Sequence, residues 1–401
     1  MIMKQRGIVK KSIVYAIKDK SNCSGCHACY AVCPKNCISM VSDDEGFWYP
    51  KVDEAKCVQC GICVEKCPVI NEVDKDEIPT AYAALNKELD IRLSSSSGGI
   101  FTLLAEHIID NGGTVFGVAF DNDLNVRHIG INKKKDIQRL QGSKYVQSKI
   151  GDCYKKTKKI LDAGNVVLFS GTPCQIAGLH SYLGKIYDNL STVDIFCLGV
   201  PSPKAWRKHL EYCGEIEKTM VQSYSFRDKS EGWKNYSTKI HYKDGRIKKI
   251  PHQQNPYMRA FLSAVCMRPS CHSCKFKGEQ RHSDITLADF WGISNVLPDM
   301  DDDKGTSLML VHSEKAEEIL TSIIDKLVIQ TVDIDEALMY NSAALYSVKA
   351  HPKRQQFLSA VDYMPFDVAV KKYCEPSLLT KMHRKTRGVL SRVKRIIIKA
   401  K

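Results

Sequence analysis

The sequence predicts an α+β protein in which a small cysteine-rich domain precedes a larger mixed α/β body. Two cysteine runs with identical spacing lie between residues 23 and 68, and a polar linker follows over residues 71–79. From Thr80 onward, short buried strands alternate with helix-like stretches. The length of 401 residues and the hydrophobic content of 43% indicate two or three domains with enough apolar residues for a sizeable core.

The cysteine-rich domain, residues 14–70, carries a repeated ligand pattern. The runs are Cys23-x2-Cys26-x2-Cys29-x3-Cys33-Pro34 and Cys57-x2-Cys60-x2-Cys63-x3-Cys67-Pro68. This spacing is typical of a bacterial-type ferredoxin with two [4Fe–4S] clusters, in which the cysteine before proline ligates the other cluster. We therefore expect one cluster on Cys23, Cys26, Cys29 and Cys67, and the other on Cys57, Cys60, Cys63 and Cys33.

Zinc sites or structural cysteines are the alternatives for these runs. A zinc site usually pairs two short Cys-x2-Cys knuckles, and two matched runs of four that each end in Cys-Pro fit that pattern poorly. Cys37 is one cysteine more than the two clusters need, and we expect it to pack as a small hydrophobe. Cysteines at metal-ligand spacings, rather than disulfides, indicate the reducing cytoplasm.

The body is predicted to extend from residue 80 to about residue 370 as one mixed α/β unit. Its predicted strands are Thr114–Phe120, Val166–Ser170, Thr192–Phe196 and Ser307–Val311. Its predicted helices are Gly99–Asp110, Asp152–Ala163, Gln175–Leu183 and Ser313–Lys326. Residues 239–248 are predicted to form a hairpin because Asp244-Gly245 is a typical two-residue turn.

A third cysteine group lies in this body. Cys266-x4-Cys271-x2-Cys274 is one ligand short of a cubane cluster, and Cys174 is the candidate for the fourth ligand. Cys174 follows a predicted strand and opens a predicted helix, which places it at the carboxyl edge of the sheet, where sites concentrate in α/β folds. From the spacing alone, a third cluster, a zinc site and simple buried cysteines all stay open.

Three motifs carry a family resemblance. They are Ser94-Ser-Ser-Ser-Gly98-Gly99-Ile-Phe101, Phe169-Ser-Gly-Thr-Pro-Cys-Gln-Ile-Ala-Gly178 and Asp284-Ile-Thr-Leu-Ala-Asp289-Phe290-Trp291-Gly292. In this order they resemble the family of coenzyme F420 hydrogenase/dehydrogenase beta subunits, with a two-cluster ferredoxin fused at the amino terminus. The resemblance gives an amino-terminal-like region at residues 78–155 and a carboxy-terminal-like region at residues 156–345. The chain departs from the family at Ala288, where members commonly have glycine.

The resemblance implies an iron–sulfur flavoprotein oxidoreductase. It implies FAD, a third [4Fe–4S] cluster beside the flavin, and electron transfer between the clusters and a substrate such as the deazaflavin coenzyme F420. The ligands of that cluster would be Cys174, Cys266, Cys271 and Cys274. The alternative function is that of an electron-transfer adaptor, a subunit of a larger redox complex without its own substrate. The expected partner is an electron donor or acceptor protein or a small redox substrate. The sequence identifies neither the substrate nor a catalytic residue.

The resemblance also indicates flavin contacts. Glycines and hydroxyls ahead of a helix start can cradle a pyrophosphate, although the same run suits a loop that caps a helix. Lys144 is a candidate for neutralising a phosphate or the flavin ring, with an exposed loop lysine as the alternative. The expected contacts are Ser96, Ser97, Gly98, Gly99, Lys144, Tyr145, Gly171 and Thr172, and Arg227, Lys234 and Arg281 are candidates for receiving an anionic substrate.

The net charge of +14 is concentrated at one end of the chain. Residues 381–401 hold nine Lys/Arg and no acidic residue, within a basic tail predicted at residues 375–401. An amphipathic helix on the anionic inner face of a membrane and a solvated terminal helix are both open for this tail. We expect no nucleic-acid partner, because no recognisable nucleic-acid module accompanies the charge. The sequence contains no run of 18 apolar residues, so we expect no membrane span. The expected location is cytoplasmic, as the cysteine spacings indicate.

Overall fold

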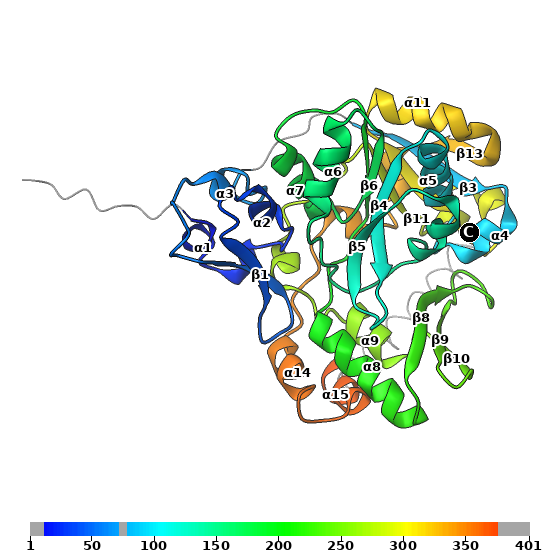
Figure 1. The fold of residues 1–401 in the computed structure, drawn as a ribbon. Helices are drawn as coiled ribbons and strands as arrows, with labels where there is room; N and C mark the ends of the chain where they lie inside the picture. Colours follow the sequence, from blue (N-terminus) through cyan, green and yellow to red (C-terminus); the bar gives the residue numbers. More distant parts are fainter. Residues whose placement is uncertain (1–11, 72–77, 376–401) are drawn as a thin grey trace, which may run out of the picture.

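The computed structural model describes residues 12–71 and 78–375. Figure 1 shows a small amino-terminal domain, coloured blue, beside a larger body built on a central sheet. This confirms the predicted α+β architecture of a ferredoxin-type domain followed by a mixed α/β body.

The amino-terminal domain has little regular structure. Its two strands, β1 (Ile38–Ser42) and β2 (Trp48–Val52), form an antiparallel hairpin. Its helical segments are all short: α1 (Ile13–Ala16), η1 (Lys20–Asn22), α2 (Ala28–Val32) and α3 (Ile62–Glu65). Cysteines make up much of its small buried core. A core of this kind depends on what the cysteines bind, as in other metal-nucleated domains.

An eight-stranded mixed sheet forms the centre of the body. The strand order is β13-β3-β12-β11-β7-β6-β4-β5, and the four strands β4, β6, β7 and β11 are parallel neighbours. The bounds are β3 (Thr80–Asn86), β4 (Thr114–Phe120), β5 (Val126–Ile131), β6 (Val167–Ser170), β7 (Leu190–Ile195), β11 (Ile285–Asp289), β12 (Ser307–Val311) and β13 (Leu327–Val332). All four predicted strands of the body are confirmed, with ends that move by at most two residues.

Helices cover both faces of this sheet, because side chains alternate along each strand. Leu168 of β6 packs in a core with α5 and α11, whereas Val167 and Phe169 pack in a core with α6 and α7. The predicted helices are confirmed as α5 (Ile100–Asp110), α6 (Cys153–Asp162), α7 (Pro173–Leu183) and α11 (Glu314–Ile323). The shorter segments around the sheet are α4 (Leu89–Ser94), η2 (Lys134–Arg139), α10 (Ile293–Val296), η4 (Pro298–Met300), η5 (Ile324–Lys326), α12 (Ile334–Leu338) and α13 (Ser342–Leu345).

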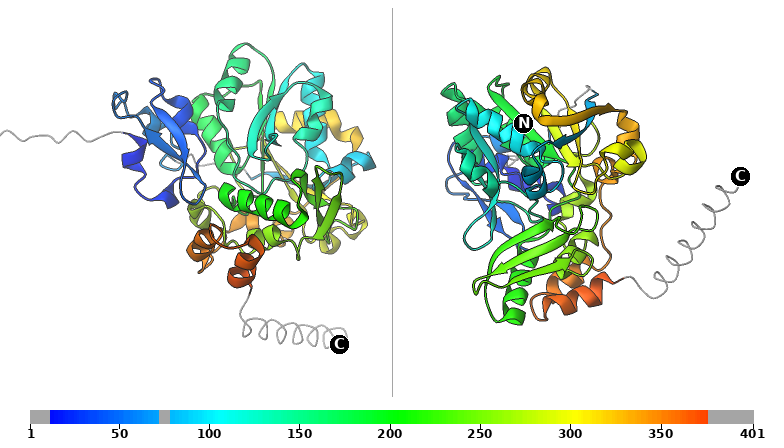
Figure 2. Two further views of the ribbon diagram at one scale, coloured as in Figure 1. Left: turned by 60° about the horizontal axis from the view of Figure 1, so that its bottom comes forward. Right: turned by 90° about the vertical axis from the view of Figure 1, so that its right-hand side faces the viewer.

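A second, smaller sheet lies beside the central one (Figure 2). Its strands are β8 (Val221–Asp228), β9 (Ser237–Tyr242) and β10 (Ile247–Pro251) in the order β10-β9-β8. The predicted hairpin is confirmed, and Gly245 has the positive φ of +87° that its turn requires. The surrounding segments are α8 (Pro203–Glu217), α9 (Pro256–Leu262), η3 (Pro269–Ser273), α14 (Arg354–Ala360) and α15 (Phe366–Cys374).

Helix α7 forms the surface on which the amino-terminal domain sits. A Cβ atom added at Gly178 would lie 3.0 Å from the Cys26 sulfur and 3.1 Å from the Tyr154 hydroxyl. The missing side chain at Gly178 therefore lets the Cys26 loop pack closely against α7. One turn further, the Ser181 hydroxyl donates to the Lys66 carbonyl at 2.9 Å. The tip of the β1–β2 hairpin is held separately, by an ion pair between Glu45 and Arg354.

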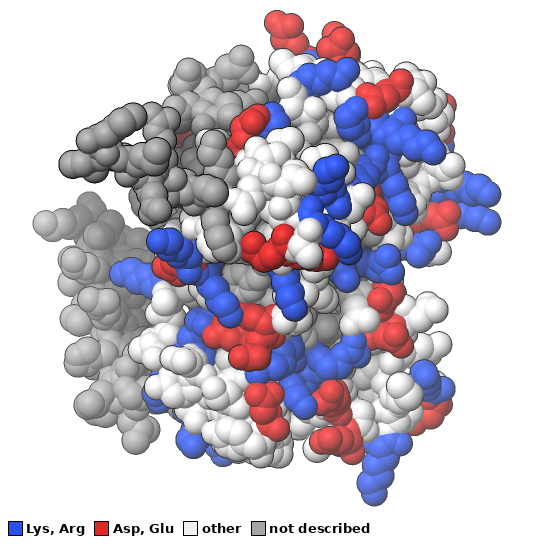
Figure 3. Space-filling view, turned by 60° about the vertical axis from the view of Figure 1, so that its left-hand side comes forward, with Lys and Arg blue, Asp and Glu red and all other residues white. Residues whose placement is uncertain are grey.

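Charges of both signs are interspersed on the face drawn in Figure 3. The predicted basic tail falls outside the described residues, apart from Glu375, and so does the linker over residues 72–77. Of the helices that the structure describes, none is long and apolar enough to cross a bilayer.

The close approach at Gly178 predicts an unusual response to alanine. In a helix interior, Gly→Ala normally stabilises by roughly 0.5–1 kcal/mol. At Gly178 the added methyl group must displace Cys26 or Tyr154, and such overpacking costs about 1–3 kcal/mol. We therefore expect Gly178→Ala to lower the free energy of unfolding, measured by anaerobic denaturant titration.

Gly214 of α8 is the matched control, because an added Cβ there meets only the Thr219 carbonyl at an ordinary 3.5 Å. Gly214→Ala should raise stability or leave it unchanged. Equal stabilisation by both alanines would contradict the docking described for α7.

Candidate functional site

The eight cysteines of the two runs line two separate pockets. Cys23, Cys26, Cys29 and Cys67 line the pocket that we call proximal. Cys33, Cys57, Cys60 and Cys63 line the pocket that we call distal. Each pocket thus combines three cysteines of one run with the pre-proline cysteine of the other. This is the grouping expected from the crossed ligand pattern, and ligation itself stays a prediction.

The thiols of these pockets influence one another. Burial, followed by the neighbouring Cys26 and Cys23, raises the pKa of Cys29 well above its usual value. Burial likewise raises the pKa of Cys26 to about 12. Thiolates in such pockets require a positively charged centre, and the iron of a cluster supplies one. The residues present therefore fit a [4Fe–4S] cluster in the proximal pocket, and the distal pocket offers the same set of four cysteine ligands.

The distal pocket has two further features. Cys60 is exposed, so this pocket reaches the protein surface. Cys37 also lines it, and the Cys37 sulfur lies 3.3 Å from that of Cys33. Cys37 belongs at the same time to the buried apolar core of the domain, as its predicted packing role requires.

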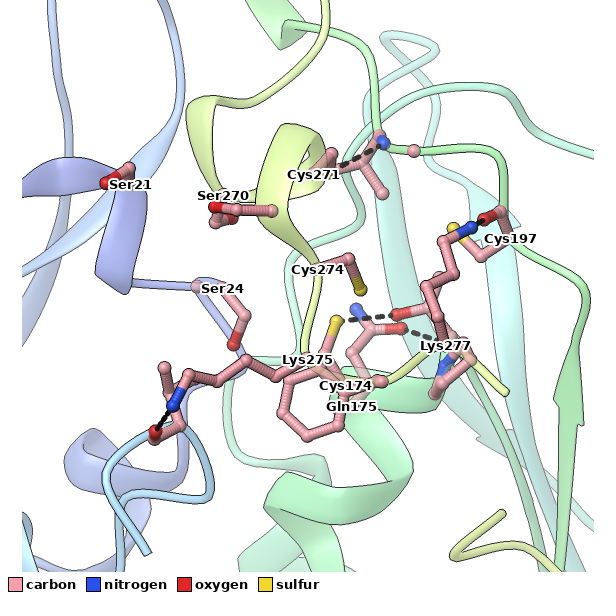
Figure 4. A pocket seen from close by; sticks show the side chains of 18 of the residues that line it. Ser21, Ser24, Cys174, Gln175, Cys197, Ser270, Cys271, Cys274, Lys275 and Lys277 are labelled. Carbon is pink, nitrogen blue, oxygen red and sulfur yellow. Dashed lines mark hydrogen bonds between the residues drawn. The ribbon is translucent and has the colours of Figure 1, made fainter. Parts of the chain in front are cut away.

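A third cysteine pocket, which we call the body pocket, lies where the carboxyl ends of two parallel strands meet. Cys174 opens α7 directly after β6, and Cys197 follows β7, the strand that pairs with β6. Cys271 and Cys274 come from η3 and the residue after it. All four line one pocket, and Figure 4 shows the Cys174 and Cys274 sulfurs turned toward each other.

The structure does not bring Cys266 to this pocket. Cys266 is fully buried in the core formed with α8, α9 and α15, and its electrostatic neighbours are Cys374 and Arg354. Cys197, by contrast, has a pKa raised to about 12, first by burial and then by its neighbours Cys271 and Cys274. The residue that sequence reasoning missed is therefore Cys197. Its position directly after a predicted strand was the available signal, the same one that identified Cys174.

The body pocket and the proximal pocket adjoin each other. Ser24, Gly25 and Val69 line both. Lys275, which lines the body pocket, donates from its ammonium group to the Val69 carbonyl at 3.1 Å. Lys277 donates to the Cys197 carbonyl at 2.6 Å. Positive side chains therefore accompany the thiols of the body pocket, and Lys275 reaches the wall that it shares with the proximal pocket.

The two loops expected to contact a flavin lie together. The Ser143 backbone N–H and hydroxyl both donate to the Ser96 hydroxyl, at 2.8 and 2.9 Å. At the other end of the same segment, Ser148 accepts a hydrogen bond of 3.0 Å from Gln175 of α7. Residues 141–148 thus run from the serine–glycine loop to the helix that carries Cys174.

Several of the predicted flavin contacts already have partners within the protein. The Gly98 N–H donates to Ser307, and a Cβ at Gly98 would lie 2.5 Å from the Ala84 carbonyl, so strand packing requires glycine there. Ser97 donates to the Thr306 carbonyl. Gly99, with φ of +84°, is the N-cap of α5 and provides no side-chain cap, which leaves this helix start suited to an anion.

Lys144 and Tyr145 hold the second loop. The Lys144 ammonium group donates to the carbonyls of Arg139, Gln141 and Gly142, and burial lowers its pKa to about 7. Tyr145 stacks on Phe261 with 4.5 Å between ring centroids.

Gly171 and Thr172 lie at the start of α7, where the Thr172 N–H donates to the Gln175 side chain. Thr172 lines the body pocket, and its hydroxyl lies 3.2 Å from the Cys174 sulfur. Thr172 and Gln175 also form a capping box that fixes the start of α7.

The basic residues considered for substrate binding are also bonded internally. Arg227 is buried and forms an ion pair with Asp289 at 2.8 Å. Lys234 pairs with Asp301 at 2.5 Å. Arg281 donates to the carbonyls of Phe276 and Ala344. These contacts give each of the three a role in the fold.

Comparisons with known proteins agree with the sequence motifs. Residues 164–337 match the family model for the carboxy terminus of the coenzyme F420 hydrogenase/dehydrogenase beta subunit, and residues 22–71 match the model "4Fe-4S dicluster domain". An uncharacterized protein of Methanocaldococcus jannaschii is 25% identical over 220 residues, which cover 45% of this chain and 58% of that protein. One of the subunits of the F(420)H(2) dehydrogenase of Methanosarcina mazei is 19% identical over 63% of this chain and 71% of its own length.

One solved structure gives a distant likeness. A chain of the F420-reducing [NiFe] hydrogenase complex from Methanosarcina barkeri aligns with a TM-score of 0.45 and 16% identity. The alignment covers 75% of this chain and 94% of that one.

The membership of the body pocket can be tested through iron content. If Cys197 is one of four ligands of a cluster in this pocket, Cys197→Ser should remove about four irons per chain, one cubane's worth. Iron is measured on anaerobically purified protein. Cys266→Ser is the matched control and should keep its iron, since its side chain is buried elsewhere. Loss of iron from Cys266→Ser with none from Cys197→Ser would reverse the assignment.

Proposed function

We propose that this chain is an iron–sulfur flavoprotein oxidoreductase, because residues 164–337 match the carboxy terminus of the coenzyme F420 hydrogenase/dehydrogenase beta subunit and residues 22–71 match a 4Fe-4S dicluster domain. Electrons would pass between [4Fe–4S] clusters and a substrate that reacts at a flavin. The observation that carries the proposal is the row of three cysteine pockets, two of which share lining residues.

The pockets suggest an order for electron transfer. The distal pocket includes the exposed Cys60 and is therefore the entry point for a protein donor or the exit to an acceptor. The proximal pocket comes next, because Cys29 interacts electrostatically with Cys63 of the distal set. The body pocket is last, and we propose that its ligands are Cys174, Cys197, Cys271 and Cys274.

A flavin completes this proposal, since a bound flavin exchanges a hydride with a substrate and single electrons with clusters. The start of α5, Ser143 and Lys144 would hold its phosphates, because a helix start and a lysine both favour an anion. The segment over residues 141–148 reaches from there to Gln175 of α7, next to Cys174. Gly171 and Thr172 would then lie on the cluster side of the flavin.

For the substrate we propose a chemical class, which is a hydride donor or acceptor. Coenzyme F420 is the first candidate, because a relative from Methanosarcina mazei is named for F420H2. That relative is also named as one subunit, which favours an alternative in which this chain is an adaptor that transfers electrons within a larger complex.

Cofactor content and turnover test the proposal together. Anaerobically purified protein should contain about twelve irons per chain, four for each cubane, and FAD in a one-to-one ratio. When a reduced ferredoxin supplies electrons, the protein alone should reduce F420 or another hydride acceptor, followed by the change in acceptor absorbance.

Each outcome has a separate meaning. A protein with iron and no flavin would contradict the enzyme proposal. Full cofactor content with turnover only in the presence of a copurifying partner would favour the adaptor function instead.

A further inference from the structure

Arg268 joins the ligand loops of the proximal and body pockets. It precedes η3 and is fully buried, with none of its surface exposed. Its Nε donates to the carbonyl of Cys23 at 2.8 Å. Its own carbonyl accepts the backbone N–H of Cys271 at 3.0 Å. One residue is thus bonded to a cysteine of each pocket.

The guanidinium group of Arg268 lies against the wall that the two pockets share. Its central carbon is 3.0 Å from the position that a Cβ of Gly25 would occupy, and Gly25 lines both pockets. The guanidinium group also lies over two aromatic rings of the amino-terminal domain. Its central carbon is 4.1 Å from the centroid of the Tyr49 ring and 5.5 Å from the centroid of the Phe47 ring. These contacts hold the charge in one place.

This charge is not balanced by a carboxylate. Within residues 12–71 and 78–375, Arg268 forms no ion pair, and its Nη2 has no hydrogen-bond partner. Its remaining polar contact is a hydrogen bond of 3.4 Å from Nη1 to the Gln147 side chain. A buried cation without a partner of opposite charge is disfavoured. Arg268 interacts electrostatically with the Cys271 thiol of the body pocket, and its Nε holds the backbone of Cys23 in the proximal pocket. Thiolate ligands in these two pockets would supply negative charge near it.

We propose that Arg268 is a positioning residue that sets the reduction potentials of the proximal and body clusters. This inference rests on the proposed function, because it requires clusters in both pockets. A cubane held by four thiolates is an anion, so a fixed cation beside it favours the reduced state. The distal cluster, whose pocket shares no residue with the body pocket, should be little affected.

The two lysines near the body pocket contribute less to this effect. Lys275 and Lys277 are each partly exposed, so water screens their charge. Arg268 has no exposed surface, and its field acts through a medium of low polarity. For this reason we assign the main effect to Arg268.

Potentiometric titration of the anaerobic full-length protein, followed by EPR, tests the proposal. The three cluster signals are first assigned with Cys→Ser variants of each pocket. Arg268→Gln should then lower the potentials of the proximal and body clusters, changing each one-electron equilibrium at least tenfold, which is about 59 mV. Arg268→Lys, which keeps the charge, should shift them less.

Gln147→Glu offers a second route if Arg268→Gln fails to load iron. It places a carboxylate beside Arg268 with little change of shape, and it should lower the same two potentials. The control is the double variant Glu45→Gln/Arg354→Gln, which removes an ion pair between the domains and leaves the net charge unchanged. It should leave all three potentials unchanged.

The measured potentials test the role of Arg268 separately from the proposed function on which it rests. Unchanged potentials in Arg268→Gln or in Gln147→Glu would overturn the role of Arg268. Equal shifts at all three clusters would also overturn it, since they would reflect a general change in docking. A wild-type protein without the body-cluster signal would instead contradict the proposed function before any variant is made.

Discussion

The contact between the amino-terminal domain and α7 is the constraint on which the rest of the structure depends. Cys174 and Gly178 are four residues apart and so lie on one face of this helix. Cys174 lines the body pocket, while Gly178 leaves room for Cys26 of the proximal pocket. A single helical turn therefore sets the separation of two candidate redox centres, and the capping box at Thr172 fixes where that turn begins.

The two parts of the protein contribute differently to the candidate site. The amino-terminal domain has a small core rich in cysteine, and its folding is expected to depend on its clusters. The body provides a rigid sheet whose parallel strands β6 and β7 end beside each other, and both ends carry a cysteine. A rigid frame of this kind keeps centres at fixed distances, which electron transfer requires.

Local patterns in the sequence predicted the parts of the structure that local interactions determine. The cysteine runs, the strand Thr114–Phe120 and the turn at Gly245 fall in this class. Cys197 could not be identified from spacing, because sheet pairing brings it to Cys174 across 23 residues of chain. Cys266 was chosen because it lies near Cys271 in sequence, but the fold turns it into an apolar core. A buried arginine without a carboxylate partner runs against ordinary burial preferences, so Arg268 gave no sequence signal.

The central claim is that the three pockets form one path to a flavin. Stopped-flow reduction by a reduced ferredoxin tests this claim most directly. Because the donor is itself a protein, it can deliver electrons only at the surface, where the distal pocket lies. Flavin bleaching should be fast in the wild type and at least tenfold slower in Cys271→Ser, which interrupts the path at the body pocket while keeping the other two. Bleaching at the wild-type rate in Cys271→Ser would contradict the account.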